Sequence, residues 1–138
     1  MNLLLALGLL AVVVFLPRLV RRARRAEPQW VDVHEVRAAL DRRPQPLVID
    51  VRAPDEFSGP LGHVPASVNI PLADLPARMP ELESSKRRRV AIVCRTDKRS
   101  VKAAELLIEA HFVDVAIVRG GMEQWNREGF GIARESDS

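Results

Sequence analysis

The residue best suited to chemistry in this sequence is Cys94, the single cysteine among 138 residues. It follows the apolar run 90–93 and precedes a polar loop of six residues: Arg95, Thr96, Asp97, Lys98, Arg99 and Ser100. Nearby cations or a helix N-terminus can lower the pKa of a thiol from about 8.5 to about 3.5–7.5, and the thiolate is the nucleophile. The loop therefore predicts a nucleophilic cysteine. The alternative is a buried structural cysteine, which is a common use of this residue.

The elements around this loop indicate an α/β domain. Apolar runs typical of strands buried on both faces occur at 47–51, 90–93 and 113–118, with a shorter strand at 67–70 and a strand or helix start at 30–33. Helical patterns occur at 34–43, 72–79, 81–85, 100–110 and 122–127, and 54–65 is typical of a loop. This alternation predicts a mostly parallel central sheet flanked by helices in three layers. Cys94 then lies at the carboxyl end of a strand, where ligands bind in such sheets.

Three segments resemble the rhodanese-like domain family of sulfurtransferases. The first joins Val48-Ile49-Asp50-Val51-Arg52, Glu56-Phe57 and the stretch from Gly62 to Leu72; the second is the Cys94 loop; the third is Val118-Arg119-Gly120-Gly121-Met122 with Trp125 and Gly129. Together they cover about residues 31–134 in the family's order. The resemblance implies a rhodanese-like fold for this part of the chain.

The resemblance also implies a function and a site. Cys94 is expected to carry sulfane sulfur as a persulfide, taken from a small anionic donor such as thiosulfate, or from a persulfide, and passed to a thiol or cyanide-like acceptor. The substrate-binding residues are then Arg95, Thr96, Asp97, Lys98, Arg99 and Ser100. Asp50 and Arg52 are expected to support the loop, or else to form a purely structural salt bridge. No cofactor is implied.

Two alternatives to this enzyme are open. A binding or sulfur-relay module without independent turnover would share the fold. Phosphatases of a related fold separate cysteine and arginine by five residues, whereas Cys94 and Arg99 are separated by four, which favours a smaller sulfur centre. Asp97 stands where the family often has glycine, a residue free to adopt unusual backbone angles. Its carboxylate is also expected to pair with Lys98 or Arg99 and so to weaken the positive field at Cys94.

The N-terminal segment indicates a membrane anchor. The apolar run from Leu3 to Leu16, extended through Val20, gives about 27 Å of helix, close to the roughly 30 Å hydrocarbon core. The arginines that follow predict a cytoplasmic domain in a single-pass cell-membrane protein. A cleaved signal peptide and a buried helix are the alternatives. We therefore predict an anchor at 1–20, a basic juxtamembrane linker at 21–29, the domain at 30–134 and a tail at 135–138.

Charge and composition argue against other classes of function. The net charge of +3 owes much to five arginines between positions 18 and 25, and the remaining chain has 16 basic against 18 acidic residues. A nucleic-acid-binding domain would need a distributed basic face, so no nucleic acid is expected as a partner. One cysteine and three histidines without ligand spacing predict no metal site. No feature of the sequence identifies a protein partner.

Overall fold

The computed structural model describes residues 27–135, and these fold around a sheet of five parallel strands in the order β1-β5-β4-β2-β3. The strands are β1 (Gln29–Val31), β2 (Leu47–Asp50), β3 (Val68–Asn69), β4 (Val90–Val93) and β5 (Val115–Val118). The helices are α2 (Val33–Ala39), α3 (Pro54–Phe57), α4 (Leu75–Arg78), α5 (Lys98–Glu109) and α6 (Gly121–Arg127), with 3-10 turns η1 (Leu72–Asp74) and η2 (Met79–Ser85). The predicted parallel α/β architecture is confirmed for this part of the chain.

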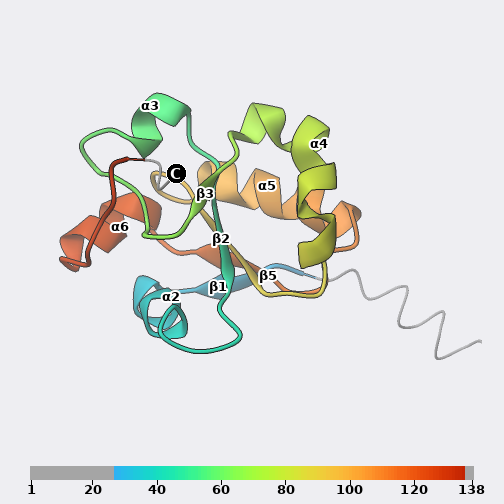
Figure 1. Cartoon of the computed structure of the whole chain (residues 1–138), viewed down its shortest axis with the longest axis horizontal. Helices are drawn as coiled ribbons and strands as arrows, with labels where there is room; N and C mark the ends of the chain where they lie inside the picture. The colour runs from blue at the N-terminus through green and yellow to red at the C-terminus, as the bar shows by residue number, and fades with distance from the viewer. Residues whose placement is uncertain (1–26, 136–138) are drawn as a thin grey trace, which may run out of the picture.

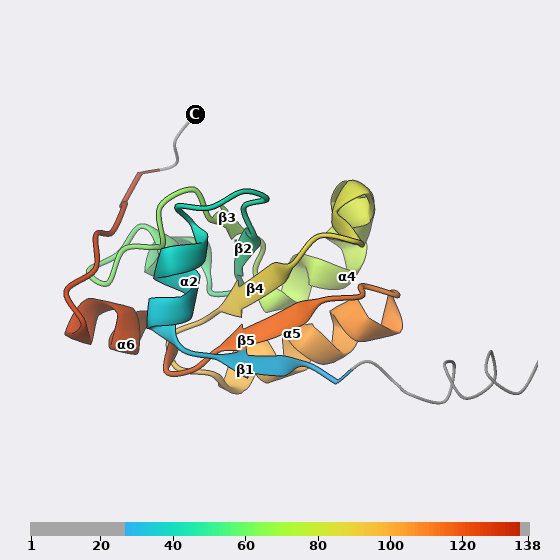
Figure 2. The ribbon, with the colours of Figure 1, turned by 90° about the horizontal axis from the view of Figure 1, so that it is seen from below.

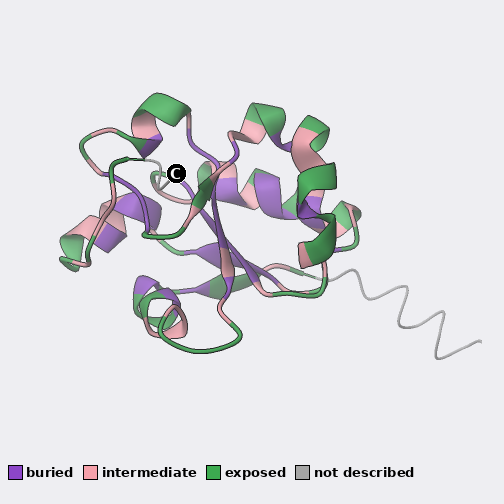
Figure 3. Cartoon of the chain, in the orientation of Figure 1, coloured by how far each residue is buried: buried purple, intermediate pink, exposed green. Residues whose placement is uncertain are grey.

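The helices cover the two faces of the sheet separately. α2 and α6 lie on one side of the strands and α4 and α5 on the other (Figures 1 and 2). Side chains along a strand point alternately to opposite faces, so each central strand supplies both cores. In β4, Val90 and Ile92 pack on the α5 side, while Ala91 and Val93 pack on the α2 side. The central strands are accordingly buried along their length (Figure 3).

The register of the central strands aligns their ends. Leu47 of β2 pairs with Val90 of β4, and Asp50 pairs with Val93. Ladder-like bonding continues one residue further, where the Val51 amide donates to the Val93 carbonyl at 3.0 Å. Because all strands run the same way, the segments after β2, β4 and β5 meet at one edge of the sheet. This carboxyl edge holds Cys94.

Three helices differ from the sequence-based expectation. The segment 54–65 was expected to be a loop, but α3 forms there, begun by Pro54 and by the Glu56 carboxylate accepting the Ala53 amide at 3.3 Å. α5 begins at Lys98, two residues earlier than predicted, because its first turn is polar and lacks the apolar periodicity used to find helices. α2 ends at Ala39, short of the predicted 43.

The predicted anchor at 1–20 and most of the linker at 21–29 lie outside the described residues. None of the helices within residues 27–135 has the length and hydrophobicity needed to span a bilayer.

Candidate active site

Cys94 follows directly on β4 at the carboxyl edge of the sheet. Its side chain continues the alternation of Val90 and Ile92 and packs into the core on the α5 side. The residue is 1% exposed. The following loop ends after three residues at Lys98, where α5 begins. The thiol therefore sits between a buried strand and the first turn of a long helix.

The loop is held from the other side by α6. The Met122 amide donates to the Cys94 carbonyl at 2.9 Å, and the Glu123 amide donates to the Arg95 carbonyl at 3.0 Å. Gly121 makes this approach feasible: a Cβ there would lie 2.8 Å from the Arg95 oxygen and closer still to the oxygens of Cys94 and Thr96. Gly121 thus allows the backbones of α6 and of the loop to approach each other, which the G-G pattern in the sequence signalled without revealing the partner.

The orientation of these carbonyls fixes the direction of the loop amides. In a trans peptide the N–H points opposite to the C=O of the same plane. The carbonyls of residues 94–96 face Gly121, so the amides of residues 95–97 point away from α6. They point towards the opposite, α5 side of the sheet, where the thiol also lies. Among the described residues, the amides of 95–100 have no hydrogen-bond acceptor. Such a ring of free N–H groups at a helix N-terminus favours an anion.

Ser100 adds an unpaired polar group to this ring. It lies in the first turn of α5, is fully buried, and its Oγ has no partner among residues 27–135. A buried hydroxyl without a partner costs roughly 1–3 kcal/mol. A group bound at the loop could accept this hydrogen bond. Of the loop residues named from the sequence, Ser100 is the one with a buried side-chain oxygen that has no hydrogen-bond partner among the described residues.

Arg99 is paired with Glu56 of α3, 43 residues earlier in the chain. Both guanidinium Nη atoms bind the carboxylate, at 2.6 and 2.9 Å. The hydrogen bond from Arg99 lowers the pKa of Glu56 to about 2, although burial opposes this shift. The Glu56 carboxylate in turn raises the pKa of Arg99, with smaller contributions from Cys94 and Asp50. Glu56 belongs to the quoted signature, but the sequence analysis assigned no role to it.

Arg95 is also paired with a carboxylate outside the loop. Arg95 donates to Glu123 of α6 at 2.7 Å, and its side chain is well exposed. Asp97 pairs with neither Lys98 nor Arg99 within the described residues, so that expectation is wrong: Glu56 occupies the Arg99 guanidinium instead. Asp97 has φ −150° and ψ −9°, so its φ is not in the positive range that favours glycine.

Asp50 and Arg52 form a buried pair beside the loop. Both are at most 1% exposed, and Arg52 binds the Asp50 carboxylate through Nε and Nη2, the latter at 2.7 Å. Arg52 also donates to the Gly62 carbonyl at 2.6 Å. The side-chain Nδ2 of Asn69 donates to the backbone carbonyls of Asp50 and Arg52. These contacts tie the end of β2 to the signature segment that follows. The pair is a buried salt bridge, and its support of the Cys94 loop stays a prediction.

His63 contacts Phe57 through its ring. The two rings stack with 3.5 Å between their centroids, and His63 Nδ1 lies 2.8 Å from the Phe57 carbonyl.

A cavity of about 220 Å³ lies elsewhere, under α2, and is lined by Val31, Val36, Ala91 and Ala116 among others. It includes none of the residues that the sequence assigned to the site.

A parallel α/β domain with a cysteine loop at the carboxyl edge, clamped by a glycine pair, defines a recognisable class of protein. The chain belongs to the rhodanese-like domain family, whose model matches residues 32–128. Among curated relatives, it is similar to a sulfurtransferase of Allochromatium vinosum, with 35% identity over 62% of this chain and 77% of the relative. It is also similar to the adenylyltransferase and sulfurtransferase MOCS3 of Arabidopsis thaliana, with 30% identity over 66% of this chain but only 22% of that protein.

Solved structures agree with this assignment. A rhodanese-related protein of Thermoplasma volcanium superposes with a TM-score of 0.67 at 26% identity, covering 78% of this chain and 99% of that one. A rhodanese-like domain protein of Staphylococcus aureus gives a TM-score of 0.64 at 30% identity, covering 76% and 98%. The fold and the family predicted from the sequence are therefore confirmed, and the homology to sulfurtransferases supports sulfur transfer in general.

Proposed function

We propose that this domain is a sulfurtransferase that carries sulfane sulfur as a persulfide on Cys94. The observation that carries the proposal is the ring of unpaired amides at 95–100, with the buried Ser100 hydroxyl, around a thiol at the carboxyl edge of the sheet. A terminal persulfide sulfur is anionic, and such a ring favours an anion. The loop residues Arg95 to Ser100 bind the substrate, and Asp50 and Arg52 hold the edge against which the loop rests.

The chemistry requires two displacements. The Cys94 thiolate attacks the sulfane sulfur of thiosulfate, a new S–S bond forms, the S–S bond of thiosulfate breaks, and sulfite leaves with the electron pair. With a persulfide donor, the leaving group is the donor thiolate. The acceptor, a thiolate or cyanide, then attacks the terminal sulfur of Cys94 and releases the Cys94 thiolate unchanged. No net oxidation or reduction occurs, and no cofactor is needed.

The ion pairs at the loop bear on the choice of donor. Arg99 is matched by Glu56 and Arg95 by Glu123, so Lys98 is the loop cation without a carboxylate partner among the described residues. Thiosulfate carries two negative charges, whereas a persulfide carries one. The balanced charges favour a singly charged persulfide donor over thiosulfate, because less of the loop's positive charge is available to a dianion.

The test is mass spectrometry of the full-length protein after exposure to thiosulfate or to cysteine persulfide, whose net charge is −1 when the persulfide is ionised, followed by removal of the donor. We expect the intact mass to rise by one sulfur atom, more completely with the persulfide, and to return to its starting value after addition of cyanide. Because Cys94 is the only cysteine, Cys94→Ser provides the control and should gain nothing. An unmodified wild-type protein with both donors would refute the persulfide mechanism.

One observation favours a second function. Cys94 is 1% exposed, so a donor reaches the thiol only if the loop or α3 moves. A rhodanese-like module that binds a partner, or relays sulfur without independent turnover, would tolerate a buried thiol. Such a module would show no catalytic turnover of thiosulfate and cyanide, and a relay would still accept sulfur from a protein persulfide.

We also propose that the domain is tethered to the cell membrane by residues 1–20 and faces the cytoplasm. The support is the apolar run from Leu3 through Val20 followed by arginines, which favours a single span with its basic flank inside. Full-length protein should sediment with membranes and resist extraction by carbonate. Recovery in the soluble fraction would refute the anchor.

A further inference from the structure

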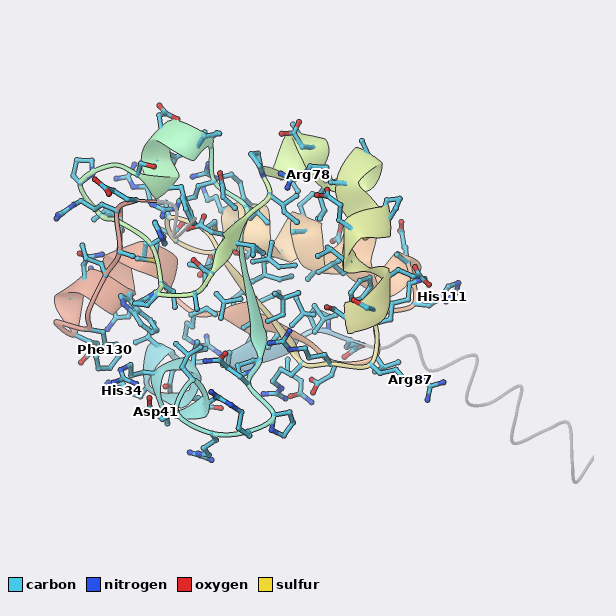
Figure 4. All side chains as sticks on the ribbon, viewed as in Figure 1. His34, Asp41, Arg78, Arg87, His111 and Phe130 are labelled. Carbon is cyan, nitrogen blue, oxygen red and sulfur yellow. The ribbon has the colours of Figure 1, made fainter. Side chains whose placement is uncertain are left out.

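The edge of the sheet opposite to Cys94, where the strands begin, carries a group of exposed arginines. Arg42 and Arg43 lie in the connection from α2 to β2, and Arg87 and Arg88 lie in the turn before β4. The two segments are adjacent, because Arg88 Nε donates to the Gln45 carbonyl at 2.8 Å. Arg87 extends away from the domain at this edge (Figure 4). We call these four residues the basic edge.

The basic edge is not neutralised by neighbouring acids. Three other cations nearby are paired: Arg37 with Asp41, Lys86 with Glu83 and Arg89 with Asp114. Among residues 27–135, no carboxylate forms an ion pair with a member of the basic edge. The acids near this end without an ion pair are Glu27, before β1, Glu109, at the end of α5, and Glu35, which lines a cavity together with Arg42. Four unpaired arginines against three unpaired acids leave a positive excess.

The chain joins the domain at the same edge. β1 begins at Gln29, whose side-chain oxygen accepts a hydrogen bond of 2.6 Å from Arg89 in the turn that carries Arg87 and Arg88. The sequence before it contains five further arginines between positions 18 and 25. Nine residues, 21–29, reach at most about 30 Å when fully extended. A domain tethered through them stays within this distance of the bilayer, and its point of attachment lies on the strand-start edge.

We propose that the basic edge docks on an anionic lipid surface and so holds the Cys94 edge away from the bilayer. This inference rests on the proposed tether. The basic edge has few charges, and as a free domain it would bind lipid weakly. The tether makes docking intramolecular, at an effective concentration in the millimolar range for a short linker, so a weak surface is sufficient. Arginines near an anionic leaflet are attracted within a Debye length, about 8–10 Å at physiological salt.

The test measures the orientation of the full-length protein reconstituted in vesicles. A donor dye is attached in a Cys94→Ser background at Asp55→Cys, on α3 at the carboxyl edge, or at Val113→Cys, before β5 at the opposite edge. Lipids carry the acceptor dye in their headgroups. On changing from phosphatidylcholine to vesicles containing phosphatidylserine, we expect energy transfer to fall from position 55 and to rise from position 113. High salt should abolish both changes.

Charge variants separate docking from tethering. The combined variant R42Q, R43Q, R87Q and R88Q should reduce the ratio of docked to undocked protein by roughly tenfold or more. The matched variant K102Q, R119Q, R127Q and R134Q makes the same change of charge elsewhere and should keep the lipid response. Equal transfer with both lipids, in protein that floats with vesicles at high salt, would overturn docking alone. Protein that does not float with vesicles at high salt would overturn the tether and this inference together.

Discussion

Glu56 is the residue that decides how much positive charge the Cys94 loop presents. Its carboxylate takes up both Nη atoms of Arg99, and it also accepts the Ala53 amide that begins α3. One side chain thereby joins α3 to α5 across the carboxyl edge. If Arg99 is to bind a substrate anion, it must share its guanidinium with Glu56 or release it. How strongly the loop attracts an anion therefore depends on Glu56, a residue of α3.

The pKa of Glu56 predicts a specific pH dependence of stability. The folded-state pKa of about 2 lies below the ordinary 4.5, so the pair stabilises the fold above about pH 5 and loses this effect as the pH falls from 4.5 to 2. With both side chains about one third exposed, we expect about 1–2 kcal/mol after solvent screening. Glu56→Gln should be destabilised by this amount at pH 7, and the difference should vanish towards pH 2, measured by urea unfolding.

The control for this variant is Glu105→Gln, which removes an exposed pair with Lys102 at 3.5 Å. Exposed pairs of this kind contribute about 0–1 kcal/mol, so its unfolding curves should nearly match the wild type at every pH. If Glu56→Gln showed the same pH profile as the wild type, the pairing of Glu56 with Arg99 would not exist in solution.

At the scale of elements, the loop depends on α6 as much as on α5. α6 begins with Gly120 and Gly121, both at positive φ, and its first amides hold the carbonyls of Cys94 and Arg95. A positive φ is costly for residues with a side chain, and Gly121 also lacks the space for one. The direction of the loop amides is therefore a consequence of how closely α6 approaches.

Gly121→Ala should disrupt this contact. The new methyl group meets three backbone oxygens that cannot rotate away, so we expect a loss of about 2–4 kcal/mol in unfolding free energy and a loss of sulfur loading at Cys94. Gly129→Ala is the matched control, because Gly129 also has positive φ, 72°, but nothing lies within 4 Å of its Cβ position. Its cost should stay near 1 kcal/mol with loading intact. Equal effects of the two variants would show that the close approach is unimportant.

The elements show which parts of the site were predictable from sequence. The strand at 90–93 and the position of Cys94 directly after it were predicted correctly, because an apolar run ending in a polar loop is a local pattern. The partners of Arg99 and Gly121 were not, because those contacts join residues 43 and more than 20 positions apart. Asp97 was expected to take the role that Glu56 performs, since spacing along the chain favours near neighbours. α3 was missed although Pro54 and Glu56 are helix-start signals, because Gly59, Pro60 and Gly62 dominated the segment.

On the scale of the whole molecule, the C-terminal segment closes the domain beyond the family match. His63 and Ala133 exchange backbone hydrogen bonds of 2.8 and 2.9 Å, an antiparallel bridge next to the Gly62 carbonyl that holds Arg52. Phe130 packs edge-on against both Trp125 and His34. Figure 4 shows Phe130 next to His34. Residues 129–134 therefore contact the rest of the described domain, and the boundary at 134 stays a prediction.

Removing these residues tests that boundary. A chain ending at Glu128 loses the two backbone hydrogen bonds between His63 and Ala133, each worth about 1 kcal/mol, and the partial burial of Phe130 and Ile132. It also loses two local backbone bonds, donated by Gly129 and Phe130, and the bond from the Trp125 indole to the Gly131 carbonyl. We expect its free energy of unfolding, measured with urea, to be about 3 kcal/mol lower. A chain ending at Glu135 should match the full-length protein. Unchanged stability after truncation at Glu128 would place the boundary at the end of α6.

The single buried cysteine has a consequence for the traffic of sulfur through this protein. A carrier with a second thiol can discharge its cargo internally by forming a disulfide, but this chain has no other cysteine. On the proposed mechanism, a sulfur atom on Cys94 therefore leaves only by transfer to a second molecule. Because the thiol is 1% exposed, we expect the lifetime of the persulfide to depend on the acceptor that reaches it.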